Sequence, residues 1–191
     1  MTTQTTTVTP IRNNAGSLRN LYLIRTVFQL IWAGLLLAPS TPPLWVEVLL
    51  TAYPLWDVAC TVYDLSTAGP GNDARSTQVI NIVLGLATAV AIGLTVQSQP
   101  RYAIAAFGVW ALLAGLLQLA VGIVRRRALG GQWAMILSGA QSTLAGAFFV
   151  LGGLSGKQHA KDLGGYAIFG AAYFLIGAVL LSRRMAKEAT A

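Results

Sequence analysis

Six long apolar runs, separated by short polar breaks, are the feature that most constrains how this chain can fold. A helix needs roughly 20 apolar residues to cross a bilayer, and the runs are continuous rather than alternating, which favours helices over strands. Hydrophobic residues make up 55% of the chain and charged residues 10%, against about 25% charged in soluble domains. We therefore predict an all-α integral membrane protein with six transmembrane helices, over residues 21–38, 45–63, 79–96, 102–124, 133–151 and 163–181.

The polar breaks predict the domain limits and the orientation. We expect a mobile polar tail over residues 1–20, a membrane domain over 21–184 and a C-terminal tail over 185–191. Nine basic residues fall on the side that carries both termini and three on the other side. Cytoplasmic loops carry the excess of Lys and Arg, so both termini are predicted to be cytoplasmic. The nine are Arg12, Arg19, Arg75, Arg125, Arg126, Arg127, Arg183, Arg184 and Lys187, and the three are Arg101, Lys157 and Lys161.

The even-numbered runs resemble one another and indicate an internal repeat. The stretches "YPLWDVACTVYD" (53–64), "WALLAGLLQLAV" (110–121) and "YFLIGAVLLSRR" (173–184) align without gaps, so that Tyr53, Trp110 and Tyr173 coincide. Each stretch follows another apolar run, which predicts a helix hairpin used three times. Only the first copy contains a proline, Pro54, and an acid at its centre, Asp57.

Asp57 is the strongest candidate for a functional residue, because a carboxylate inside a membrane span costs about 2.5–3.5 kcal/mol on insertion scales. The spacing of Tyr53, Asp57, Thr61 and Asp64 places them on one helix face, which should point into the bundle. Arg25, in the first run, lies near the same end of its span and could pair with Asp57 or with Asp64.

Three interpretations of Asp57 follow. The pair with Arg25 could be a structural joint between the first two helices, which we favour. Alternatively, Asp57 could exchange protons or ions, or face a lipid or another ligand.

Other polar and small residues extend this picture. A polar layer of Gln29, Thr61, Asn81, Gln118, Ser138 and Gln141 is predicted around Asp57. Two stripes with a spacing of four residues permit close helix packing: Gly85, Ala89 and Gly93, and Ser138, Ser142 and Gly146. Three consecutive arginines that follow the fourth run are expected to contact anionic lipid head groups: Arg125, Arg126 and Arg127.

Several function classes are disfavoured by the sequence. It contains no G-x-S-x-G, P-loop or H-E-x-x-H motif, so we expect no enzyme, no catalytic residues and no cofactor. The single cysteine, Cys60, forms no intrachain disulfide, and no paired His or Cys ligands predict a metal site. Basic residues are not interleaved with aromatics in a stripe, so no nucleic-acid partner is expected.

The last three runs carry a resemblance to a known family. The stretches "FGVWALLAGLLQLAVGIVRRRALGGQWAMILSGAQSTLAGAFFVL" (107–151) and "IFGAAYFLIGAVLLSRR" (168–184) resemble the short-repeat membrane domain of the HdeD-like acid-resistance family. The likeness covers residues 102–184 well and 21–97 weakly. The residues that match are Trp110, Gly115, Gln118, Arg125, Trp133, Ser138, Gly139 and Gly146.

The resemblance implies a six-span protein of the bacterial inner membrane, with no established catalytic residues. We therefore expect a non-enzymatic protein with a structural or stress-protective role, acid stress included. Its partners would be membrane lipids, further copies of itself or other membrane proteins. The alternative is a small proton-linked transporter or channel that uses Asp57 and the buried polar layer.

Overall fold

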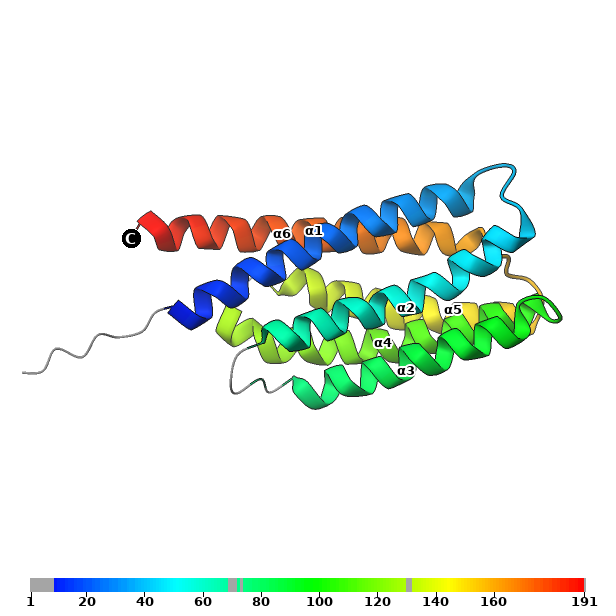
Figure 1. The fold of residues 1–191 in the computed structure, drawn as a ribbon, viewed down its shortest axis with the longest axis horizontal. Helices are drawn as coiled ribbons and strands as arrows, with labels where there is room; N and C mark the ends of the chain where they lie inside the picture. Colours follow the sequence, from blue (N-terminus) through cyan, green and yellow to red (C-terminus); the bar gives the residue numbers. More distant parts are fainter. Residues whose placement is uncertain (1–8, 69–71, 73, 130–131, 191) are drawn as a thin grey trace, which may run out of the picture.

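The computed structural model describes residues 9–68, 72, 74–129 and 132–190, with no strand among them. It forms an elongated bundle of six helices, labelled as in Figure 1. They are α1 (Thr9–Leu37), α2 (Pro43–Thr67), α3 (Arg75–Thr95), α4 (Pro100–Leu129), α5 (Trp133–Leu154) and α6 (Asp162–Thr190). Each predicted run lies inside one helix, except that residues 38 and 96 fall one position beyond the ends of α1 and α3. This agreement confirms the all-α class.

The helices extend beyond the predicted runs at both ends of the chain. α1 begins at Thr9, so residues 9–20, which were assigned to a polar tail, are helical, and Leu18 is buried among residues of α6. α6 continues to Thr190 through most of the expected C-terminal tail. The two helices support each other here, because Met185 lies close to Gly16. Polar composition misled the prediction, since burial against a neighbouring helix decides whether such a segment is helical. Residues 1–8 lie outside the described part.

The six helices form a closed ring. Each packs against the next along the chain, and α6 packs against α1. Consecutive helices alternate in direction, so both termini lie at one end of the bundle, called here the terminal end; the opposite end is the distal end (Figure 1). The most extensive contacts join α4 with α5, α1 with α6 and α2 with α3. They therefore run between the hairpins expected from the repeat and not within them.

A seam of glycines explains the tight α4–α5 pair. Gly108, Gly115 and Gly122 recur every seven residues on α4, and Gly139, Gly146 and Gly153 do so on α5. A Cβ atom at Gly146 would lie 2.2 Å from the backbone nitrogen of Leu112, and one at Gly115 would lie 2.6 Å from that of Thr143. The two backbones thus touch, as in membrane helix pairs that associate through small residues.

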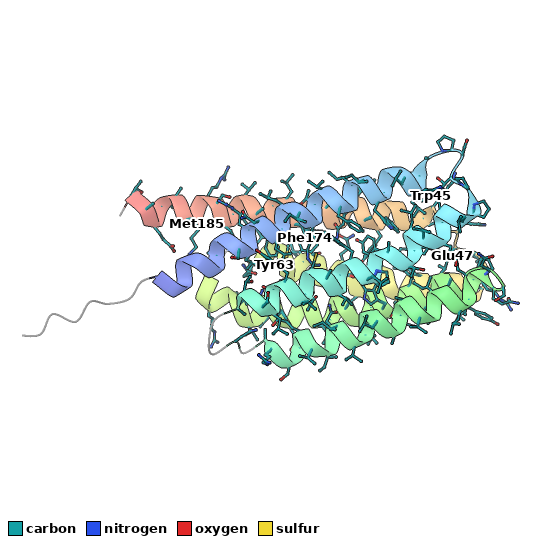
Figure 2. The ribbon with its side chains drawn as sticks, in the orientation of Figure 1. Trp45, Glu47, Tyr63, Phe174 and Met185 are labelled. Carbon is teal, nitrogen blue, oxygen red and sulfur yellow. The ribbon has the colours of Figure 1, made fainter. Side chains whose placement is uncertain are left out.

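The bundle is apolar on its outer surface, and its interior holds both apolar and polar side chains. Large apolar side chains project from its outer surface (Figure 2), among them Leu94, Phe148 and Leu151, which are 76%, 68% and 68% exposed. Five of the six helices are long and apolar enough to cross a membrane. α2, which carries Glu47, Asp57 and Asp64, is the exception. Such an arrangement is typical of membrane proteins, in which polar side chains face the bundle interior.

Six aromatic side chains fill the bundle interior on the distal side. Their neighbouring ring centroids are 4.7–6.4 Å apart, within the usual range for aromatic pairs. The indole of Trp32 also donates a 2.7 Å hydrogen bond to the carbonyl of Leu49. The next carbonyl along the chain, that of Leu50, lacks its helical donor because Pro54 has no N–H group. This aromatic cluster consists of Trp32, Tyr53, Phe107, Trp110, Phe149 and Tyr166.

Candidate functional site

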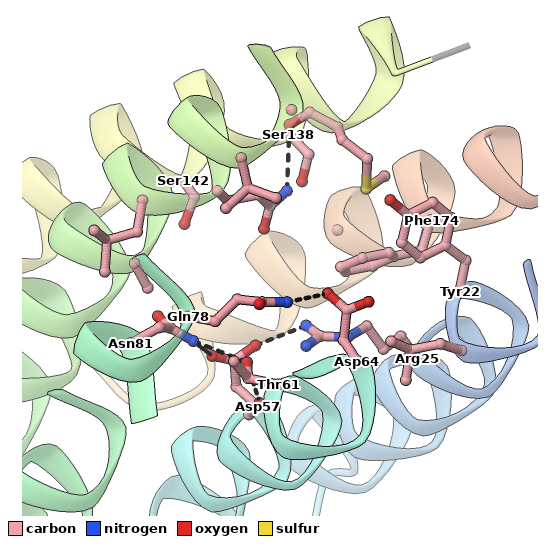
Figure 3. Close-up of a pocket in the computed structure, with 18 of the residues that line it drawn as sticks. Tyr22, Arg25, Asp57, Thr61, Asp64, Gln78, Asn81, Ser138, Ser142 and Phe174 are labelled. Carbon is pink, nitrogen blue, oxygen red and sulfur yellow. Dashed lines mark hydrogen bonds and ion pairs between the residues drawn. The ribbon is translucent and has the colours of Figure 1, made fainter. Parts of the chain in front are cut away.

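A cavity of about 120 Å³ lies in the middle of the ring, and all six helices line it. It begins at the aromatic cluster, where Tyr53, Trp110 and Tyr166 form its floor, and extends toward the terminal end. There it is bordered by Asp64 and Arg125. Figure 3 shows how polar side chains from several helices converge on it.

Asp57 is held from two sides. Its Oδ1 atom is 2.6 Å from Nη1 of Arg25, and its Oδ2 atom accepts a 2.6 Å hydrogen bond from Nδ2 of Asn81 (Figure 3). Asn81 also donates to the hydroxyl of Thr61 at 3.1 Å. The predicted pair of Arg25 with Asp57 is therefore present, and it joins α1 to α2, while Asn81 joins α3 to the same carboxylate. The four residues of the predicted stripe, from Tyr53 to Asp64, all line the cavity.

Asp64 does not pair with Arg25, the partner that was considered for it from the sequence. Its Oδ2 atom is 2.8 Å from Nη2 of Arg125 and accepts a 2.6 Å hydrogen bond from Gln78. Arg125 thus turns inward, with its side chain only 13% exposed. Its neighbours Arg126 and Arg127 are exposed. The helical period explains the difference, because three consecutive residues cannot share one face of a helix.

Arg25 is also anchored to α6. Its guanidinium carbon lies 5.1 Å from the centroid of the Phe174 ring, within the range of a cation–π contact. One side chain of α1 therefore contacts both α2 and α6. This geometry suits a joint between helices, because the arginine has both a charged partner and an aromatic face.

The rest of the predicted polar layer also lines the cavity, together with Ser142 from the predicted packing stripe. Gln118 donates to the carbonyl of Met135 at 3.3 Å, and the Ser142 hydroxyl donates to that of Ala111 at 2.9 Å. Because Ser142 has only one proton to give, its 2.8 Å contact with the hydroxyl of Tyr166 is donated by the tyrosine. Ser138 and Gln141 also line the cavity.

Some of the residues assigned to helix packing lie close to a neighbouring helix, and Gly93 does not. Gly146 lies in the α4–α5 seam, and a Cβ at Gly85 would lie 2.5 Å from Val58. Ala89 is buried. Gly93, in contrast, is exposed and has nothing within 4 Å of its Cβ position, so it permits no close approach. Ser142 lines the cavity and also contacts α4, because its hydroxyl donates to the carbonyl of Ala111.

Three polar atoms of residues that line this region have no hydrogen-bond partner among the described residues. They are Oε1 of Gln29, Oδ1 of Asn81 and Nε1 of Trp110. Gln29 and Trp110 are only 6% and 3% exposed, and leaving a buried polar group unpaired costs about 1–3 kcal/mol. Each of the three atoms is covered by neighbouring protein atoms, so none of them faces the open space of the cavity.

Sequence reasoning missed several of these residues. Trp110 was interpreted as a repeat position, and nothing marked Gln78 or Gln132. Gln132, just before α5, accepts a 3.3 Å hydrogen bond from the hydroxyl of Tyr22. One signal was available: a glutamine beside an apolar run rarely faces lipid, so its presence predicts an interior position.

The cavity is electrically neutral. Its charged lining residues are Arg25, Asp57, Asp64 and Arg125, which form two ion pairs. Among the described residues no three His, Cys, Asp or Glu side chains gather to hold a metal ion. The arrangement can therefore offer hydrogen bonds and aromatic surface to a small molecule.

The fold and cavity define a class, a six-helix bundle with an apolar exterior and a central cavity lined by both polar and apolar side chains. Comparison of the chain with family models, with curated proteins and with solved structures finds no match.

Proposed function

We propose that this chain is an integral membrane protein that binds a small polar solute in the central cavity and moves it across the membrane, as a small transporter or channel. The observation that carries the proposal is the cavity itself, lined by all six helices and by polar side chains such as Gln118, Ser138 and Gln141. A bundle with only a packing role would fill this space with apolar side chains.

The position of the aromatic cluster supports a cavity that a solute enters from the terminal end and that is closed toward the distal end. The cluster lies between the cavity and the distal end, and its members Phe107 and Trp32 are 0% and 1% exposed. In the proposed mechanism, the solute enters the cavity from the terminal end. It then passes to the distal side when these rings move apart, so the present arrangement is the state closed on the distal side.

A cavity-filling variant tests this proposal. We expect purified protein in lipid vesicles to increase the flux of small polar solutes, measured by stopped-flow light scattering. Ser138→Phe places a ring in the cavity that Ser138 lines, and it should abolish the added flux. Leu137→Phe is the matched control, because Leu137 is the preceding residue and is 48% exposed on the outer surface.

Two results would count against transport. One is a wild-type flux equal to that of protein-free vesicles for every solute. The other is unchanged flux in Ser138→Phe. Size-exclusion profiles and circular dichroism of both variants establish whether they are folded, and a second filler, Ala114→Phe at another lining position, replaces Ser138→Phe if that variant is unfolded.

A structural role of the HdeD-like kind is the second candidate function. It is favoured by the ion pairs, because both cavity carboxylates are bound to arginines and link α1, α2 and α4. Under this proposal the protein is non-enzymatic and protects the membrane under stress, acid stress included, through contacts with lipids or other membrane proteins. It predicts no flux in the vesicle experiment, which separates the two candidates.

We further propose that all six helices, α2 included, span a bacterial inner membrane with both termini in the cytoplasm. The exposed basic residues Arg126, Arg127 and Arg183 near the terminal end support this orientation.

Single cysteines in a Cys60→Ser background test the orientation. Lys161→Cys, in the connection before α6, should react with a membrane-impermeant thiol reagent added outside intact cells. Arg126→Cys should react only after the cells are permeabilised. Labelling of position 126 from outside would reverse the orientation.

A further inference from the structure

A layer of side chains borders the cavity toward the terminal end. This terminal layer consists of Leu18, Tyr22, Asp64, Gln78, Arg125 and Gln132, all of which line the cavity. Four of the six residues are at most 6% exposed, and the side chains of Asp64 and Arg125 are 18% and 13% exposed. The terminal layer therefore stands between the cavity and the solvent at this end of the bundle (Figure 1).

Two contacts in the terminal layer cross the ring of helices instead of following it. The ion pair of Asp64 with Arg125 joins α2 to α4 over 2.8 Å, although α3 lies between these helices along the ring and their direct contact is limited. The hydroxyl of Tyr22 donates a 3.3 Å hydrogen bond to Gln132, just before α5, and α6 lies between α1 and α5 along the ring. Because side chains that link such helices extend over the interior, these two contacts cover the terminal side of the cavity.

The ion pair of Arg25 with Asp57 has a different place in the ring. It joins α1 to α2, which are neighbours, and Asn81 of the next helix, α3, binds the same carboxylate. These three helices can move together without breaking it. Movement of α2 away from α4 at the terminal end, in contrast, must separate Asp64 from Arg125.

The two boundaries of the cavity also differ in chemistry. On the distal side the aromatic cluster is apolar, so parting its rings would expose buried apolar surface to water. In the terminal layer, water can replace the partners of Asp64, Arg125 and Gln132 as they separate. The net change in free energy is then small, because bonds within the protein are exchanged for bonds with water. The terminal layer is therefore the boundary that opens more readily.

Resting on the proposed function, we propose that the ion pair of Asp64 with Arg125, supported by the contact of Tyr22 with Gln132, is the gate through which a solute passes between the terminal end and the cavity. The gate opens when α4 and the start of α5 move away from α1 and α2 at this end. The deeper arginine–aspartate joint and the aromatic cluster stay in place during this step, so the cavity opens to one side at a time.

A reversible cross-link tests the gate in lipid vesicles. Asp64→Cys and Arg125→Cys are introduced together in the Cys60→Ser background and joined by a bifunctional methanethiosulfonate, whose links a reductant cleaves. Flux of glycerol, glycine and lactate, small polar probes of different charge, should be lost on cross-linking and return with the reductant. Gly16→Cys with Met185→Cys is the matched control, because these positions face each other between the neighbouring helices α1 and α6. Its cross-link should leave the flux unchanged.

The outcomes separate the gate from transport itself. Flux that persists after cross-linking of positions 64 and 125 would overturn the gate and leave transport supported. Absence of flux for every probe, in the wild type and before cross-linking, would instead overturn the proposed function.

Labelling of the cavity tests the gate without any flux, and it decides the question if the double cysteine variant does not fold. Ser138→Cys in the Cys60→Ser background places a thiol on the cavity lining, and its reaction with a small thiol reagent is followed in detergent. Arg125→Met removes the ion pair and should speed this labelling about 2- to 5-fold, which corresponds to one partly exposed ion pair. Arg126→Met, at the exposed neighbouring arginine, should leave the rate unchanged. Equal labelling rates in the two methionine variants would overturn the gate.

Discussion

Replacing Arg25 by methionine is expected to lower the free energy of unfolding by about 3–5 kcal/mol, the usual cost of removing one partner of a buried ion pair. The substitution keeps most of the apolar stem of Arg25 but leaves Asp57 without its 2.6 Å partner, in a side-chain environment only 15% exposed. It also removes the contact with the Phe174 ring. The free energy can be measured by titrating the detergent-solubilised protein with sodium dodecyl sulfate and following circular dichroism.

The double variant Arg25→Met/Asp57→Asn decides whether the loss comes from the unpaired charge. Its asparagine keeps an acceptor for Asn81 but carries no charge, so it should recover at least half of the lost stability. Arg126→Met, an exposed arginine at the terminal end of α4, should change stability by less than about 0.5 kcal/mol. If Arg25→Met behaves like Arg126→Met, the pair is not a joint.

The second large effect is expected in the glycine seam. Gly146→Ala should lower the free energy of unfolding by about 1–3 kcal/mol, the usual cost of overpacking, and Gly146→Leu should prevent folding. A Cβ at this position would lie 2.2 Å from the nitrogen of Leu112 and 2.6 Å from the carbonyl oxygen of Gly108. Both are backbone atoms, so the clash is relieved only when α4 and α5 move apart.

Gly93→Ala is the matched control for the seam. It makes the same chemical change within a helix, but nothing lies within 4 Å of the added methyl group. Since alanine favours helix over glycine by about 0.8–1 kcal/mol, Gly93→Ala should be neutral or slightly stabilising. Equal losses for Gly93→Ala and Gly146→Ala would show that glycine acts through helix propensity and not through backbone contact.

These two sets of variants separate the features that hold the bundle together from those that face the cavity. The ion pair of Arg25 with Asp57 and the glycine contacts join neighbouring helices, whereas Ser138 lines the cavity in which the proposed solute binds. We therefore expect mutations of the first kind to reduce stability, and Ser138→Phe to reduce solute flux.

The sequence alone determined the all-α class and the six helices, and it limited the partner of Arg25 to Asp57 or Asp64. The apolar runs are long enough to identify helices without any neighbour. The pair could be predicted because a charge inside an apolar helix must have a partner, and Arg25 is the one basic residue inside the first run. The helical period then placed Tyr53, Thr61 and Asp64 on the same face as Asp57, and all of them line the cavity.

Only the tertiary structure decided how the helices associate and which groups remain unpaired. The partner of Asp64 is Arg125, 61 positions later by their numbers, and no sequence period links two helices that meet across a ring. The seven-residue spacing of the glycines was present in the sequence, but small residues are common in membrane helices. Whether a glycine allows contact, as Gly146 does, or faces open space, as Gly93 does, depends on where the neighbouring backbone lies. The cavity was also decided only by the tertiary structure, because all six helices contribute to its lining and no single segment forms it.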